Sequence, residues 1–151
     1  MSAQPLNREA VYVALWNMIL ASSALVGMFV TMARLLEHID NTAVEQMPAL
    51  YMMQQGETWE RMGKGIPAKR TLSAALFIYI ATTKGSGVLP TTLLNNAVDA
   101  IDALFNSPPG CVITLGGLVE HVYLAEGEVR YYEGLLQNKS PVVIPIRILV
   151  P

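Results

Sequence analysis

Charged side chains are scarce in this chain of 151 residues: Asp, Glu, Lys and Arg make up 15%, against about a quarter in a typical soluble domain. Apolar residues make up 52%. We expect one domain over residues 1–151, and so little polar surface indicates that a partner covers part of its apolar surface. The 10 basic and 12 acidic residues nearly balance, which predicts no general attraction to nucleic acid or to an anionic membrane.

Cysteine is nearly absent as well, since Cys111 is the single one. A disulfide within the chain is therefore excluded, and assembly in a reducing compartment is expected. No cation or histidine stands beside Cys111 in the sequence to favour a thiolate, so we expect it to be a small core residue.

The motifs of common enzymes are missing too: there is no P-loop, nucleophile elbow or dinucleotide-binding fingerprint. The two histidines each follow a glutamate, as Glu37-His38 and Glu120-His121. Such pairs could supply metal ligands, but neighbouring residues of a strand point to opposite faces and cannot chelate from one side. We expect both histidines at polar strand positions, and we predict no metal, no cofactor and no catalytic site.

One long uncharged run extends from Ala10 to Ala33, long enough to span a bilayer. Polar residues such as Asn17 and Ser22 interrupt it, which favours a helix followed by a strand and no membrane association. Asn7 is a suitable helix N-cap, and apolar residues then recur at helical spacing. We expect a strand over Met28–Ile39 after Gly27.

The closing run Val142–Pro151 has the strongest pattern in the sequence. Its even positions from Val142 to Val150 are all β-branched, which predicts a strand with one face in the core. Pro145 and Arg147 lie on the other face. Because Pro145 has no N–H for a ladder, we expect this strand at a sheet edge or a bulge, where it is exposed to pairing with another chain.

The remaining elements define the fold class. We expect strands over Pro48–Met53 and Arg70–Thr83, the second one central because it is apolar on both faces. A helix is expected from Pro90 to Phe105, ended by Pro108-Pro109-Gly110. The sequence therefore predicts an α+β domain with two helices packed on one face of a largely antiparallel β-sheet.

The segment Gly56–Lys69, rich in glycine and mixed charge, is expected to be a long loop. Trp59 in this loop either packs back onto its own domain or anchors a partner, as interface tryptophans often do. The basic residues here are expected to face a neighbouring subunit or another protein. The candidate interface residues are Trp59, Arg61, Lys64, Lys69, Arg70, Pro145 and Arg147.

An ordered series of short motifs runs through most of the chain: Met47-Pro48-Ala49-Leu50-Tyr51, Gln55-Gly56-Glu57, Thr71-Leu72, Leu94-Asn95-Asn96-Ala97-Val98, Thr114-Leu115-Gly116-Gly117-Leu118-Val119, Gly127, Gly134-Leu135-Leu136 and Ile144-Pro145-Ile146-Arg147-Ile148-Leu149. In this order the sequence from about Val30 to Pro151 resembles the tail terminator (tail completion) proteins of long-tailed bacteriophages.

The resemblance implies a structural virion protein, assembled in the host cytoplasm and located at the tail–neck junction. It implies a ring, of six copies, that caps the tail tube and ends its polymerisation. The implied partners are further copies of this chain, the major tail tube protein and a head-completion or neck protein. Viral DNA would pass through the lumen without specific binding, because the sequence has too few cations for a continuous basic lining.

Two alternatives remain open. One is a different head–tail joining, or neck, subunit. The other is an enzyme, because Glu37-His38-Ile39-Asp40-Asn41 is similar to the His-Val-Asn-Asn stretch of hot-dog acyl-transfer enzymes. That fold requires a long helix within a few residues, where this sequence has Pro48 and an apolar strand.

Overall fold

The computed structural model describes residues 5–61, 63–66, 68–81, 89–125, 130–131 and 139–150. The motif pieces at Gly127 and Gly134–Leu136 and the last residue, Pro151, lie outside these ranges. The elements follow in the order α1 (Arg8–Leu20), α2 (Ser23–Met28), β1 (Thr31–Ala33), 3-10 helices η1 (Ile39–Asn41) and η2 (Val44–Gln46), β2 (Ala49–Glu60), β3 (Lys69–Ala81), α3 (Pro90–Phe105), β4 (His121–Leu124), β5 (Arg130–Tyr131) and β6 (Lys139–Val150).

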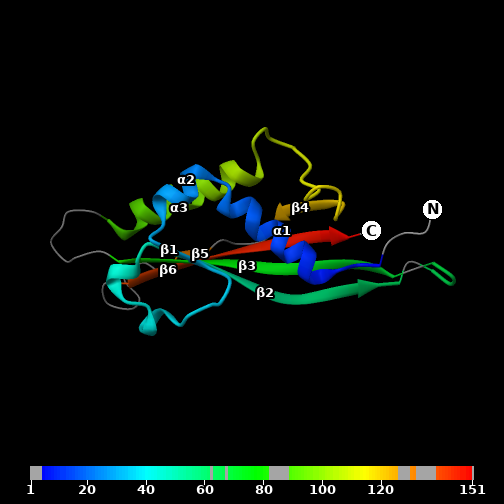
Figure 1. Cartoon of the computed structure of the whole chain (residues 1–151), viewed down its shortest axis with the longest axis horizontal. Helices are drawn as coiled ribbons and strands as arrows, with labels where there is room; N and C mark the ends of the chain where they lie inside the picture. Colours follow the sequence, from blue (N-terminus) through cyan, green and yellow to red (C-terminus); the bar gives the residue numbers. More distant parts are fainter. Residues whose placement is uncertain are drawn as a thin grey trace.

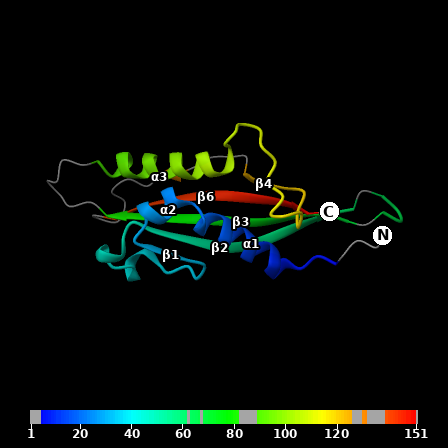
Figure 2. The same ribbon diagram turned by 45° about the horizontal axis from the view of Figure 1, so that its top comes forward.

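The described elements form two layers, with the α-helices on one face of a twisted sheet (Figures 1 and 2). The strand order is β1-β2-β3-β6-β4, with β5 pairing with β6 as well. β1 runs parallel to β2, and the other pairs are antiparallel. The predicted α+β class is confirmed, with α2 as a short third helix that the sequence pattern did not predict.

The alternation predicted in the closing strand is confirmed in β6. Val142, Ile144, Ile146, Ile148 and Val150 are all buried, while the residues between them are partly exposed. The buried set pairs across β3 with residues such as Leu72 and Leu76 and faces the helices. The main core therefore lies between the sheet and the helix layer.

The placement of β6 at a sheet edge was wrong. β6 pairs with β3 on one side and with β4 and β5 on the other. Pro145 falls between the stretches that pair with β4 and β5, and its carbonyl accepts from Ala125 N at 2.8 Å on that side. N and C=O of one residue point to the same neighbour in an antiparallel strand. The missing donor of Pro145 therefore faces the interruption between β4 and β5.

The two long helices are confirmed, and each has a local reason. Asn7 caps α1 by accepting from Ala10 N at 3.1 Å. α3 begins with Pro90 in its first turn and buries Leu94, Ala97, Ile101 and Phe105 on one stripe. No helix in the described part of the chain is both long and apolar enough to cross a membrane.

Two predicted segments differ from the structure. The expected strand Met28–Ile39 is reduced to the three residues of β1, because α2 extends through Gly27 to Met28. The expected loop Gly56–Lys69 is half strand: β2 continues to Glu60 and β3 begins at Lys69, so these strands form one long hairpin. Cross-strand pairing of Glu57–Glu60 with β3 offsets the weak strand preference of this segment, and Gly56 itself lies in an irregularity where the pairing shifts register.

The segment between β1 and β2 covers one end of the sheet face that has no helices. Ile39 and Met47 pack there with Tyr51 and Tyr79 in a second, small cluster. Lys139 ties this segment to β6 by donating to Ile39 O at 3.1 Å and Thr42 O at 2.9 Å. The rest of that face, toward the hairpin, is not covered by any described element and is called the open face below.

Candidate assembly interface

A β-bulge sets the direction of the side chains at the end of the β2–β3 hairpin. Gln54 pairs with Ala74, but Glu57 pairs with Leu72, so β2 carries one extra residue at this point. Simple alternation from Leu50 would turn Glu57 toward the open face. The bulge reverses the alternation and places Glu57 and the residues in phase with it on the helix side of the sheet.

Glu57 consequently meets the start of α1. Arg8 donates to both carboxylate oxygens, from Nε at 2.6 Å and from Nη2 at 3.0 Å, and Trp59 Nε1 donates to Oε2 at 2.6 Å. The hydrogen bond from Arg8 is the main cause that holds the pKa of Glu57 below its ordinary value, and the hydrogen bond from Trp59 adds to it. Both exposed side chains of the pair keep contact with water, so this contact orients the hairpin more than it stabilises the fold.

Trp59 stands out at this end of the molecule because 61% of its surface is exposed. Its indole N–H is bonded to Glu57, and the Arg70 guanidinium carbon lies 5.0 Å from its ring centroid. The ring is therefore held in place but not buried. Of the two roles predicted for Trp59, packing onto its own domain or anchoring a partner, the exposure favours the second.

The hairpin end gathers five of the predicted interface residues. Arg61, Lys64 and Lys69 are exposed, and Arg70 is half-buried against Trp59. The Arg70 Nε atom is buried and has no hydrogen-bond partner among the described residues. These residues therefore lie close together at one end of the molecule, and most of them belong to strand ends and not to a long loop, while their role at an interface stays a prediction.

The other two predicted residues, Pro145 and Arg147, lie on the open face in the middle of the sheet. Arg147 pairs across β3 with Ser73 and donates from Nη1 to Ser73 Oγ at 3.1 Å. The sequence placed Pro145 and Arg147 at an exposed edge, which is wrong, yet both keep partly exposed side chains. They belong to a different surface from the Trp59 group, on the opposite side of the sheet.

The exposed edge that the sequence predicted for β6 is found in β2. β2 pairs with β1 only along Ala49–Tyr51, and from Met52 to Glu60 its outer side has no paired strand among the described residues. The backbone groups there are available to a further strand. The bulge at Gln55 and Gly56 interrupts this edge, which limits uncontrolled pairing.

The outer side of α1 is a surface that sequence reasoning missed. Val11, Leu15 and Ile19 of α1 are buried, while its outer side combines Val13 and Leu20, each 39% exposed, with the exposed polar residues Glu9 and Asn17. The signal for this surface is the uncharged run Ala10–Ala33 itself, which supplies more apolar side chains than one buried helix face needs.

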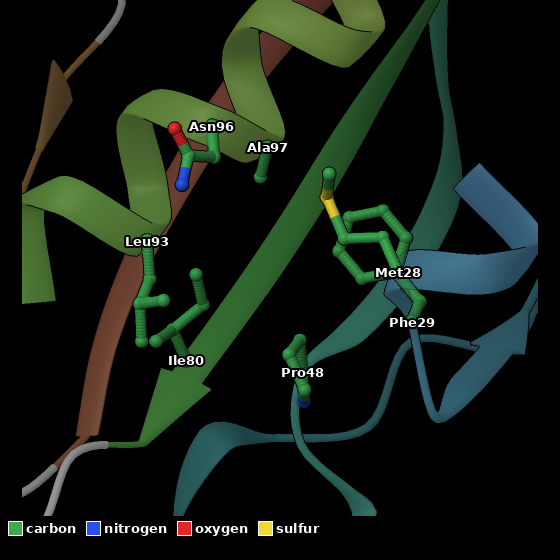
Figure 3. A pocket seen from close by; sticks show the side chains of 7 residues that line it. All are labelled: Met28, Phe29, Pro48, Ile80, Leu93, Asn96 and Ala97. Carbon is green, nitrogen blue, oxygen red and sulfur yellow. The ribbon is translucent and has the colours of Figure 1, made fainter. Parts of the chain in front are cut away.

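An apolar pocket of about 190 Å³ lies at the end of the helix layer away from the hairpin (Figure 3). Phe29 and Met28 form one wall, and Leu93, Asn96 and Ala97 of α3 form another. Ile80 and Pro48 close it from the sheet side. It has a single amide and no ionisable group in its lining.

The histidines and the cysteine have local roles in the structure. His38 lies in a loop and not in a strand as expected, and its Nδ1 accepts from Asp40 N at the start of η1. His121 is in β4, and its Nδ1 accepts from Ile113 N at 3.2 Å. Cys111 is half-buried and not a core residue, with Sγ donating to Phe105 O at 3.2 Å.

The residues weighed for other chemistry do not come together. Among the described residues, no group of three or more His, Cys, Asp or Glu side chains is placed to hold a metal ion. The stretch from Glu37 to Asn41, similar to a hot-dog enzyme motif, leads into η2 and then β2 and not into a long helix.

Comparison with known proteins gives one kind of result. No protein-family model matches the sequence, and no curated protein matches it. Among solved structures, a chain from a structure described as the virion of a native gene transfer agent (GTA) particle is similar to this one. The two share 11% sequence identity with a TM-score of 0.54, over 95% of this chain and 96% of that chain. This chain therefore shares its fold, over nearly its whole length, with a protein chain of a virion particle.

Proposed function

We propose that this chain is a structural virion protein that forms a hexameric ring on the last ring of a tail tube. The ring ends polymerisation of the tube and presents a docking surface to a head-completion or neck protein. Its place in the virion is the tail–neck junction, and the genome passes through its lumen.

The observation that carries the proposal is the fold shared with a virion chain over nearly the whole length of both chains. Because neither chain has a large unmatched part, the likeness supports the view that both chains are building blocks of virion particles. The order of short motifs, which resembles tail terminator proteins, adds the position at the tail end. The two lines of support are independent, because one uses backbone geometry and the other uses residue identities.

The surfaces of the molecule suit a ring. A closed ring needs a heterologous contact, in which one patch meets a different patch on the next copy. The described part of the chain offers unlike patches: the unpaired edge of β2 with Trp59, the outer side of α1 with exposed Val13 and Leu20, and the open face with Arg147. A low content of charge is also expected for a protein that buries much surface on assembly.

Removal of the protein from the producing particle tests the proposal. A stack of tube rings exposes a new end after each addition, so growth continues until a different ring covers that end. We expect tails of irregular and increased length, not joined to heads, in electron micrographs of particles made without this chain.

The neck alternative gives a different result in the same experiment. Loss of a neck subunit would leave tails of normal length that fail to join heads. Normal tail length would therefore refute the terminator role. The enzyme alternative is tested separately, by thioester hydrolysis with the purified full chain, and we expect no activity.

A further inference from the structure

The hairpin end is a strongly basic surface. Between Glu57 and Arg70 the chain carries four cations, Arg61, Lys64, Lys69 and Arg70, against two carboxylates. Of the two carboxylates, Glu57 already forms an ion pair with Arg8. Glu60 alone is left to balance the four cations within the hairpin. Exposed Trp59 and Ile66, 61% and 55% exposed, add an apolar component to this surface.

The region near the other edge of the sheet, on the same face as the helices, has the reverse character. Residues 89–125, which form α3, the following loop and β4, contain no Lys or Arg and three carboxylates, Asp99, Asp102 and Glu120. All three are exposed. Asp99 and Asp102 stand in the second half of α3, and no basic residue compensates the negative end of the helix dipole there. A cation from outside would be favoured at this end of α3.

Apolar exposure accompanies these carboxylates. Val112 and Leu118 in the loop after α3 are 65% and 44% exposed. A surface with carboxylates around exposed aliphatic side chains complements one with cations around an exposed tryptophan. The second half of α3 and the loop to Glu120 are called the acidic side below, and the β2–β3 hairpin end is called the basic end.

The strand register places the end of the acidic side, at Glu120, level with the start of the basic end, while α3 lies further back along the sheet (Figures 1 and 2). Thr71, beside the basic end, pairs with Leu149 in β6, and Leu149 pairs with His121 in β4. His121 directly follows the acidic side. β2 and β4 lie toward opposite edges of the sheet, three positions apart in the order β2-β3-β6-β4. Figure 1 shows the loop before β4 and the hairpin toward the same end of the molecule.

We infer that the basic end of one subunit docks on the acidic side of the next copy of this chain. The inference rests on the proposed ring function and names its contact. Two different, complementary patches near opposite edges of a subunit make a heterologous contact, and such a contact gives a closed ring when the rotation between successive copies closes. Trp59, fixed by Glu57 and Arg70, is the anchor, and Val112 and Leu118 are the apolar surface that it meets.

Charge reversal on each side tests the contact. We expect Arg61→Glu/Lys64→Glu and Asp99→Lys/Asp102→Lys each to lower ring formation at least about tenfold, because like charges then face each other across the interface. The variant with all four substitutions should restore the ring. Native mass spectrometry of the full chain and electron microscopy of tails isolated from cells producing each variant are the measurements.

The matched control is Asp40→Lys/Glu45→Lys, which makes the same charge change at two exposed acids away from both surfaces. It should assemble as the unmodified chain does, and circular dichroism of all variants should match. Rings formed equally well by both reversals would overturn the docking inference and leave the ring proposal standing. If only the hairpin variant loses the ring and the fourfold variant does not restore it, the basic end contacts the tube protein. That result would also overturn the docking inference. Absence of a ring from the unmodified chain on isolated tails would refute the proposed function itself.

Discussion

At the scale of single residues, the hairpin end is organised by one carboxylate. Glu57 accepts from Arg8 on α1 and from Trp59 on its own strand, and Trp59 in turn stacks against Arg70. A second contact joins α1 to the other strand of the hairpin, because Tyr12 of α1 donates to Ser73 O of β3 at 3.0 Å. Burial is the main cause that raises the pKa of Tyr12 above its ordinary value. Ser73 has no paired residue in β2, since it lies opposite the bulge.

A pH-dependent difference should follow from Glu57. Its depressed pKa contributes stability above the carboxylate range near about 4.3, and that contribution is lost as the pH falls through the folded-state pKa. Glu57→Gln should therefore lower the free energy of unfolding slightly at neutral pH and not at all in acid. Urea unfolding at both pH values measures this. Glu60→Gln is the control, because Glu60 makes no ion pair within the described residues, and an equal effect from it would contradict the assigned role of Glu57.

At the scale of elements, β6 shows that a residue pattern can predict which face of a strand is buried. Its alternating burial follows directly from its β-branched positions, because side chains of a strand point alternately to opposite faces. The position of β6 within the sheet could not be predicted from the same pattern. A proline needs only a stretch without a ladder donor, and the interruption between β4 and β5 supplies that stretch in the middle of a sheet.

The alternation in β6 gives a matched pair of substitutions. Ile146→Ala removes a fully buried side chain between the sheet and the helices and should cost about 2–5 kcal/mol of unfolding free energy. Leu149→Ala removes as many carbons from the partly exposed open face and should cost roughly 1 kcal/mol or less in the monomer. Denaturant unfolding compares them, and equal losses would contradict the assigned faces.

The hairpin shows the limit of sequence-based prediction at this scale. The residues from Gly56 to Glu60 resemble a loop because local preference is weak, and pairing with β3 overrides it. The bulge adds one residue that no alternation pattern reveals, and it decides which face Glu57 and Trp59 occupy. The sequence therefore predicted that most of the candidate residues lie in one segment, but it did not predict which face of the sheet they occupy or the partly exposed apolar side chains of α1.

At the scale of the whole molecule, the sharing of a fold with a virion chain and the resemblance to tail terminators concern the same large part of the sequence. The helices cover one face of the sheet, the segment between β1 and β2 covers one end of the other face, and the open face, the outer edge of β2 and the outer side of α1 stay exposed among the described residues. The hydrophobic core therefore buries only part of the chain's apolar side chains, and the others stay exposed on the single chain.

The proposed lumen has a consequence for DNA binding. With 10 basic and 12 acidic residues, and the hairpin cations assigned to a neighbouring subunit, few cations remain for DNA phosphates. The purified ring should bind duplex DNA no more tightly than about 1 µM at physiological salt. Tight binding that is lost in Lys64→Ala/Lys69→Ala would show that these residues line the bore, against the present account.

The most direct test of the central claim is cryo-electron microscopy of intact particles, with the density between tail tube and head compared with this fold. The account predicts one closed hexameric ring of this chain on the last tube ring, with the β2–β3 hairpin of each copy against α3 of the next. Intact tails whose tube–neck junction contains no ring of this fold would contradict it.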